Sequence, residues 1–265
     1  MNNEKMNTDR MNQDVLRHLF TQHNVDSGAI SLLGPVVHQF TKPGVYQGEA
    51  LLNERPAGRF FLWVEDACPA SQVDIDLSNL PAWAGNCCDD KAGARFVVNP
   101  KGYAVFHVSS SRGGYAVVVR QTGEKAETVF DSRELGPGDV FAASLLRPGR
   151  YQVTNTITGA KGVVEVAYPR VGEKPRQRLE PVTVECHEKE FRPARIRLES
   201  AQGQVYQMHG RGRLRIELLE PDDGPSAGKA PHYAAWGKPP DEPLVRKPTP
   251  KAAAKPRTRA KSKKT

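Results

Sequence analysis

The sequence predicts an all-β protein whose main body is an antiparallel β-sandwich. Short segments along most of the chain alternate apolar and polar residues or are rich in β-branched and aromatic side chains. Gly and Pro, present 23 and 21 times, separate these segments with turns. No long amphipathic helical pattern lies between the predicted strands, which excludes the Rossmann, TIM-barrel and P-loop classes.

The N-terminal region carries the one predicted helix. Residues 1–11 are polar and predicted to be disordered. Asn12 is placed to cap a short helix over residues 13–23, with Asp14 favourably located in its first turn. We expect this helix, part of a lead-in spanning residues 12–34, to pack on the β core; docking on a partner is the alternative. The sequence shows no apolar run of the kind that forms a signal peptide or a membrane span, so we expect a cytoplasmic protein.

The main β-sandwich domain is predicted over residues 35–170. The apolar alternation and the turn residues predict strands at residues 44–52, 59–65, 73–77, 95–98, 103–109, 115–120 and 128–131. Residues 78–93 form a predicted loop between two of them. The clearest pattern follows, because two Pro-Gly turns bound a meander. Its strands are predicted at residues 140–146, 151–157 and 163–168.

Part of this meander resembles the closing strands of cupredoxin-like β-sandwiches. The matching stretches are Pro148-Gly149-Arg150-Tyr151 and Gly162-Val163-Val164-Glu165-Val166. The resemblance implies a sandwich of the cupredoxin or immunoglobulin type. Cupredoxins place Cys, His and Met in the loop between these strands. The present loop instead offers Asn155, Thr156, Thr158, Ala160 and Lys161, which argues against copper there.

A smaller second β unit is predicted over residues 182–220, after a charged linker at residues 171–181. Its strands are predicted at residues 182–186, 194–199, 205–208 and 214–218. The unit resembles the opening half of a cupredoxin-like domain in its residues Phe191, Pro193, Ile196 and Gly203. Because so short a unit buries little core alone, we expect it to pack on the first sandwich or to pair with another chain.

Residues 221–265 are predicted to be a disordered tail that ends in a basic run. Residues 246–265 contain nine Lys or Arg and no acid, which leaves 29 basic and 30 acidic residues in the rest of the chain. The tail resembles those of linker histones and bacterial histone-like proteins, which implies nucleic-acid binding. A solubilising tail without a dedicated partner is the alternative. The candidate contact residues are Arg246, Lys247, Lys251, Lys255, Arg257, Arg259, Lys261, Lys263 and Lys264.

Soft and imidazole metal ligands occur as two adjacent pairs, Cys186-His187 and Met208-His209. Copper or zinc would suit such ligands. Adjacent strand residues point to opposite faces, however, so each pair offers one ligand to a face. We therefore expect Cys186 and Met208 in the core and both histidines on the surface, with no metal bound.

Other reactive residues lie in predicted loops and strand faces. Cys68 and the run Cys87-Cys88-Asp89-Asp90 suggest a redox or metal loop, a disulfide from Cys68 to Cys87 or Cys88, or free thiols. Ser109-Ser110-Ser111 with His107 suggests a nucleophile, but no Gly-x-Ser-x-Gly motif accompanies it, so a polar hairpin end is expected. Asp74 and Asp76 share one face of a strand, which we expect to be solvated.

These observations predict a non-enzymatic binding or assembly protein without a cofactor. Its basic tail would contact nucleic acid or another polyanion, and its second β unit would contact a protein partner or another copy of the chain. The alternatives are a cupredoxin-like protein that binds a metal or small ligand and, with no residues to assign to it, a hydrolase.

Overall fold

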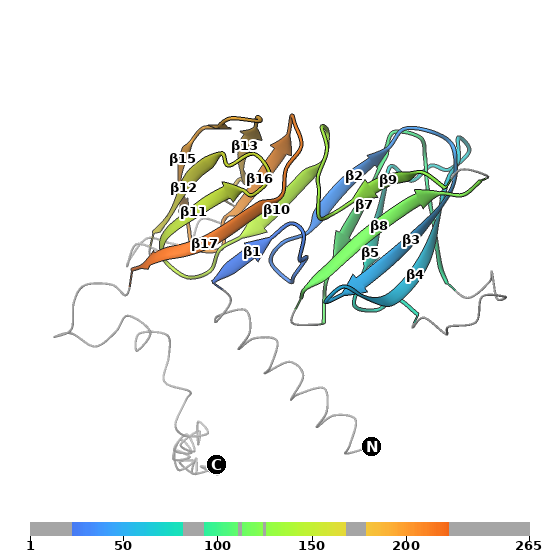
Figure 1. Ribbon diagram of the computed structural model, residues 1–265, viewed down its shortest axis with the longest axis horizontal. Coiled ribbons are helices and arrows are strands. Elements are labelled where there is room, and N and C mark those ends of the chain that lie inside the picture. The colour runs from blue at the N-terminus through green and yellow to red at the C-terminus, as the bar shows by residue number, and fades with distance from the viewer. Residues whose placement is uncertain (1–22, 82–92, 111–112, 124–125, 168–178, 223–265) are drawn as a thin grey trace, which may run out of the picture. The chain divides into compact units, whose positions relative to one another are not determined.

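A computed structural model describes residues 23–81, 93–110, 113–123, 126–167 and 179–222 (Figure 1). These residues form strands and turns, and none of them is helical. The described part of the chain accordingly contains no helix of the length and apolar character needed to cross a membrane. The strands are β1 (Asn24–Asp26), β2 (Val36–Phe40), β3 (Gly44–Leu52), β4 (Arg55–Val64), β5 (Gln72–Asp76), β6 (Ala94–Val98), β7 (Gly102–His107), β8 (Tyr115–Gln121), β9 (Thr128–Asp131), β10 (Val140–Ser144), β11 (Gly149–Asn155), β12 (Lys161–Ala167), β13 (Val182–Cys186), β14 (Phe191–Arg192), β15 (Arg195–Glu199), β16 (Gly203–Met208) and β17 (Leu214–Pro221).

The strands build three sheets. One five-stranded sheet has the order β6-β4-β3-β8-β9, and the other has the order β1-β17-β11-β12-β15. A seven-stranded sheet, β14-β13-β16-β10-β2-β7-β5, takes strands from both ends of the described chain. In Figure 1, β2 and β10 join its two halves.

The predicted antiparallel sandwich is wrong. The chain steps from one sheet to another and back, so four strand pairs are parallel: β4 with β6, β5 with β7, β12 with β15 and β13 with β16. The result is a solenoid-like stacking of sheets. The sequence could not reveal it because a half-buried strand has the same two-residue alternation whether its neighbour is parallel or antiparallel.

The predicted second β unit at residues 182–220 forms no sheet of its own. Its strands complete the same sheets as β10, β11 and β12, and one hydrophobic core cluster runs through all three sheets. The predicted helix at residues 13–23 lies outside the described residues except for His23, which belongs to no helix. Of the predicted linker at residues 171–181, the structure describes only residues 179–181.

The same set of strand pairings occurs twice along the chain. In the first set, β3 pairs with β4 and β8, β4 with β6, β5 with β7, and β2 with β7. In the second, β11 pairs with β12 and β17, β12 with β15, β13 with β16, and β10 with β16. Parallel and antiparallel directions match in every case. We call β1–β8 repeat 1 and β9–β17 repeat 2.

Local contacts repeat along with the topology. The Tyr46 hydroxyl donates to the Lys42 carbonyl at 2.8 Å, and the Tyr151 hydroxyl donates to the Arg147 carbonyl at 2.8 Å. Each tyrosine lies two residues after a glycine, and both glycines have φ near +149°. Both therefore belong to a Pro-Gly-x-Tyr-Gln stretch that begins the third strand of its repeat.

The leading strand of each repeat completes a sheet of the other. β1 pairs with β17, and β9 pairs with β8. A buried serine follows each leading strand, Ser27 and Ser132, and exchanges hydrogen bonds with Leu214 and Val117 respectively. The two repeats are thus interlocked, and neither forms its complete set of sheets alone.

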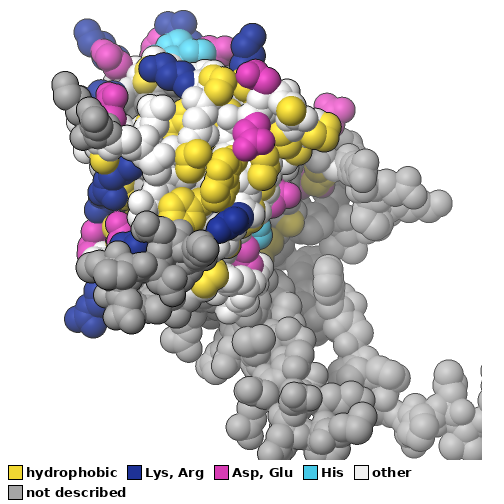
Figure 2. All heavy atoms as spheres, turned by 90° about the vertical axis from the view of Figure 1, so that its right-hand side faces the viewer, with side chains coloured by type: hydrophobic (Ala, Val, Ile, Leu, Met, Phe, Trp, Pro, Cys, Tyr) yellow, Lys and Arg dark blue, Asp and Glu magenta, His cyan; other side chains and the backbone are white. Residues whose placement is uncertain are grey.

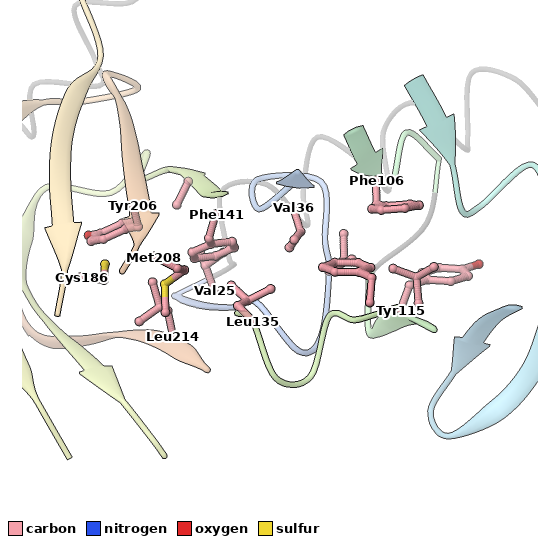
Figure 3. Packing of buried hydrophobic residues seen from close by; sticks show 14 of the residues in the cluster. Val25, Val36, Phe106, Tyr115, Leu135, Phe141, Cys186, Tyr206, Met208 and Leu214 are labelled. Carbon is pink, nitrogen blue, oxygen red and sulfur yellow. The ribbon is translucent and has the colours of Figure 1, made fainter. Parts of the chain in front are cut away.

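The seam between the repeats lies at β2 and β10. Val36 pairs with Phe141, and these two residues hold equivalent places because Val36 also pairs with Phe106 and Phe141 with Tyr206. Figure 3 shows buried side chains continuing across this seam, from Tyr206 and Phe141 to Val36 and Phe106. The core is therefore shared by both repeats.

Candidate functional site

The basic run at residues 246–265 and the loop cysteines Cys87 and Cys88 lie outside the described residues. Their predicted roles stay predictions. Cys68 is described and is a half-buried free thiol.

Cys186 and Met208 lie in the core, as the strand alternation predicts. They are 1% and 2% exposed and face one another in register on β13 and β16. Figure 3 shows both sulfur atoms among Tyr206 and Leu214. Burial raises the pKa of the Cys186 thiol to about 12. The thiolate that metals require is therefore disfavoured, and neither sulfur belongs to a surface site.

His187 and His209 come together on the surface. Each is the first residue after its strand, and β13 and β16 are parallel and in register, so the two side chains lie next to each other. Their rings stack with centroids 4.8 Å apart and planes 11° apart. The backbone holds both residues, because His209 N donates to Cys186 O at 2.9 Å and His187 N donates to Glu190 O at 3.0 Å.

Glu185 adds a carboxylate to this pair. It precedes His187 by two residues and therefore lies on the same face of β13. Its Oε2 is 3.3 Å from His187 Nε2. One ligand atom from each of the three side chains falls within 4.8 Å of the others. Glu185 was not among the predicted ligands, because the sequence does not show that β13 pairs with β16.

Repeat 1 carries a different cluster at the equivalent place. Asp76 pairs with His107 as Glu185 pairs with Gln207, so Ser78 and Ser109 stand where repeat 2 has His187 and His209. The Asp76 carboxylate accepts hydrogen bonds from both hydroxyls and from Asn79, with Ser78 Oγ at 2.6 Å.

These contacts decide the chemistry of the repeat 1 cluster. Burial raises the pKa of Asp76, but the hydrogen bonds from Ser109, Ser78 and Asn79 outweigh it and leave the pKa lowered. The Ser109 hydroxyl donates to the Asp76 carboxylate and not to His107. The cluster therefore holds the ends of the two strands together and does not form a serine–histidine pair. Asp74, on the same strand face, is exposed and accepts from Gln72 at 3.0 Å. Ser111 lies outside the described residues.

A pocket of about 410 Å³ forms between the start of β10 and strands β2, β3 and β9. His38 and Asp139 line it, with Nδ1 and Oδ1 2.6 Å apart. The second Asp139 oxygen accepts from Gly136 N at 2.6 Å, and the His38 ring packs on Phe40 and Phe130. The imidazole is thereby fixed at the pocket wall. The pair lies 101 residues apart in sequence, and no sequence motif pointed to it.

A further surface feature lies on the five-stranded sheet of repeat 1. Figure 2 shows hydrophobic side chains gathered on the side of the molecule where β3 and β4 lie. On that sheet Val45, Phe61 and Trp63 are half-buried and Val97 is 42% exposed. The Arg95 guanidinium carbon lies 5.6 Å from the Trp63 ring centroid.

Comparisons of the chain with protein-family models, with curated proteins and with solved structures find no match.

Proposed function

We propose that the protein is a non-enzymatic binding protein that holds nucleic acid or another polyanion through residues 246–265. The observation that carries the proposal is the separation of charge. Nine Lys or Arg and no acid occur in these 20 residues, whereas the rest of the chain has 29 basic and 30 acidic residues. Positive charge at this density attracts a polyanion by releasing its condensed counterions.

The folded body supplies a contrast to this run. Several of its described arginines contact carboxylates: Arg213 Nε lies 2.8 Å from Asp26, and Arg133 bridges Asp131 at 2.7 Å and Glu54 at 3.0 Å. These guanidinium groups already have partners of opposite charge. These arginines are therefore less available to a polyanion than the residues of the basic run.

The composition of the run also defines the binding mode. It contains no aromatic residue, so bases have no stacking partner there. Contacts to phosphate alone carry no sequence information. We therefore expect binding that is insensitive to nucleotide sequence and strongly dependent on salt.

The test measures duplex DNA binding by fluorescence anisotropy over a range of salt concentrations. The full chain should bind at low salt, with log K falling linearly against log salt; nine engaged charges would give a slope of about −8. Deleting residues 246–265 should abolish binding. A variant with the nine basic residues changed to Gln keeps the length of the segment and should also lose binding.

Two results would contradict the proposal: no DNA binding by the full chain at low salt, or equal binding by the Gln variant. Heparin and anionic vesicles tested in parallel identify the preferred polyanion.

A further inference from the structure

We propose that Glu185, His187 and His209 bind a divalent transition-metal ion, with Zn²⁺ as the reference ion. Two imidazoles and one carboxylate form a donor set that zinc uses in proteins. Glu185 and His209 are exposed and His187 is half-buried, so an ion can reach all three from solvent. This inference does not depend on the basic run.

The geometry needs only side-chain movement to form the site. Zinc binds imidazole nitrogen at about 2.0–2.1 Å and carboxylate oxygen at about 2.0–2.2 Å, so two ligands at tetrahedral corners lie about 3.4 Å apart. His187 Nε2 and Glu185 Oε2 are already 3.3 Å apart. The most distant ligand atoms are within 4.8 Å, which ring rotation can close while the backbone stays hydrogen-bonded.

Repeat 1 serves as an internal reference for this cluster. There the Asp76 carboxylate accepts hydrogen bonds from two serine hydroxyls and one amide, which stabilise its negative charge without a cation. In repeat 2 imidazoles replace the hydroxyls, and within the described residues Glu185 has the one longer contact with His187. Equivalent strand pairs thus hold a carboxylate with three hydrogen-bond donors in repeat 1 and a carboxylate beside two imidazoles in repeat 2.

Charge around the site favours a cation. Glu188 lies in the turn after His187, and its Cγ is 2.9 Å from the position of a Cβ on Gly210, next to His209. A side chain at residue 210 would displace Glu188, so glycine permits this approach. Glu188 thus adds a second carboxylate near the cluster, beside that of Glu185. Three protein ligands also leave the fourth coordination position of a tetrahedral zinc ion open to water.

The test measures Zn²⁺ binding to the full chain by isothermal titration calorimetry. The variant His187→Ser/His209→Ser installs the residues that repeat 1 carries and should remove one zinc per chain while the circular dichroism spectrum stays unchanged. Glu185→Gln should weaken binding at least as much as the about 10–100-fold typical of losing an outer-shell partner. His107→Ser, which removes a half-buried histidine of repeat 1, is the matched control and should bind as the parent does.

A second control separates this site from a thiolate site. Cys186→Ser should leave zinc binding unchanged, because the buried thiol takes no part. NMR of the unmodified chain provides a readout without substitution: Zn²⁺ should shift the imidazole signals of His187 and His209 together. The proposal is overturned if the double Ser variant retains every zinc of the parent, if Cys186→Ser removes one, or if the two imidazoles do not respond.

Discussion

The contacts of two equivalent carboxylates in this protein depend on which residues lie two positions after each carboxylate and two positions after its strand partner. Asp76 and Glu185 hold equivalent places, yet Asp76 accepts hydrogen bonds from Ser78 and Ser109 whereas Glu185 faces two imidazoles. Hydroxyls can donate to a carboxylate and leave it coordinatively satisfied. Imidazoles present lone pairs that, with the carboxylate, can hold a cation. Three side-chain differences, one at the carboxylate and two at the residues facing it, therefore separate the hydrogen-bonded carboxylate of repeat 1 from the candidate metal ligands of repeat 2.

Asp76 should stabilise the fold in a pH-dependent manner. Its pKa is lowered in the folded state, so its contribution is present above the unfolded-state value near 3.8 and is lost as pH falls through the folded-state pKa. Asp76→Asn should lower the free energy of unfolding at pH 7 by about 1 kcal/mol, discounted for partial exposure. Urea denaturation of both proteins at pH 7 and pH 3 measures the difference, which should shrink at pH 3. An equal difference at both pH values would contradict this assignment.

In one equivalent strand pair of the two repeats, the glycine and the larger residue are exchanged between the strands. In repeat 1, Gly48 on β3 pairs with Phe60 on β4. In repeat 2, Val153 on β11 pairs with Gly162 on β12. Each pair combines one glycine with one larger side chain, and an aromatic ring covers each glycine: Phe60 lies over Gly48, and Phe191 lies over Gly162.

Gly48→Ala should therefore be strongly destabilising. A Cβ at residue 48 would lie 1.9 Å from the Phe60 ring, so the ring must move within a packed core. We expect a loss of about 1–3 kcal/mol in the free energy of unfolding. Gly203→Ala is the matched control, because its Cβ would meet Pro181 at an ordinary 3.5 Å. Chemical denaturation of the two variants compares them; equal losses would show that the Phe60 contact is not the cause.

Strand positions could be predicted from the sequence, but strand partners could not. The predicted strands at residues 44–52 and 182–186 are β3 and β13 with the same bounds. Alternation also placed Cys186 and Met208 in the core correctly. The candidate metal cluster depends on β13 lying beside β16, which alternation does not encode. Glu185 was consequently missed, although its spacing from His187 was visible.

At the scale of the whole molecule, the described fold is a pair of interlocked repeats that share one core. The sequence contains one readable sign of this, since Lys42-Pro43-Gly44-Val45-Tyr46-Gln47 and Arg147-Pro148-Gly149-Arg150-Tyr151-Gln152 match in pattern. The second stretch was predicted to belong to a sandwich because its turn residues are compatible with either arrangement. The shared frame lets residues be exchanged between equivalent positions without designing a new backbone.

The most direct test of the account is to move the candidate metal ligands from repeat 2 into repeat 1. The variant Asp76→Glu/Ser78→His/Ser109→His places them on the equivalent strand frame. Calorimetric titration with Zn²⁺ should then show one more bound ion per chain than the parent protein. A folded variant that binds no additional zinc would contradict the claim that the two repeats present equivalent sites distinguished only by their side chains.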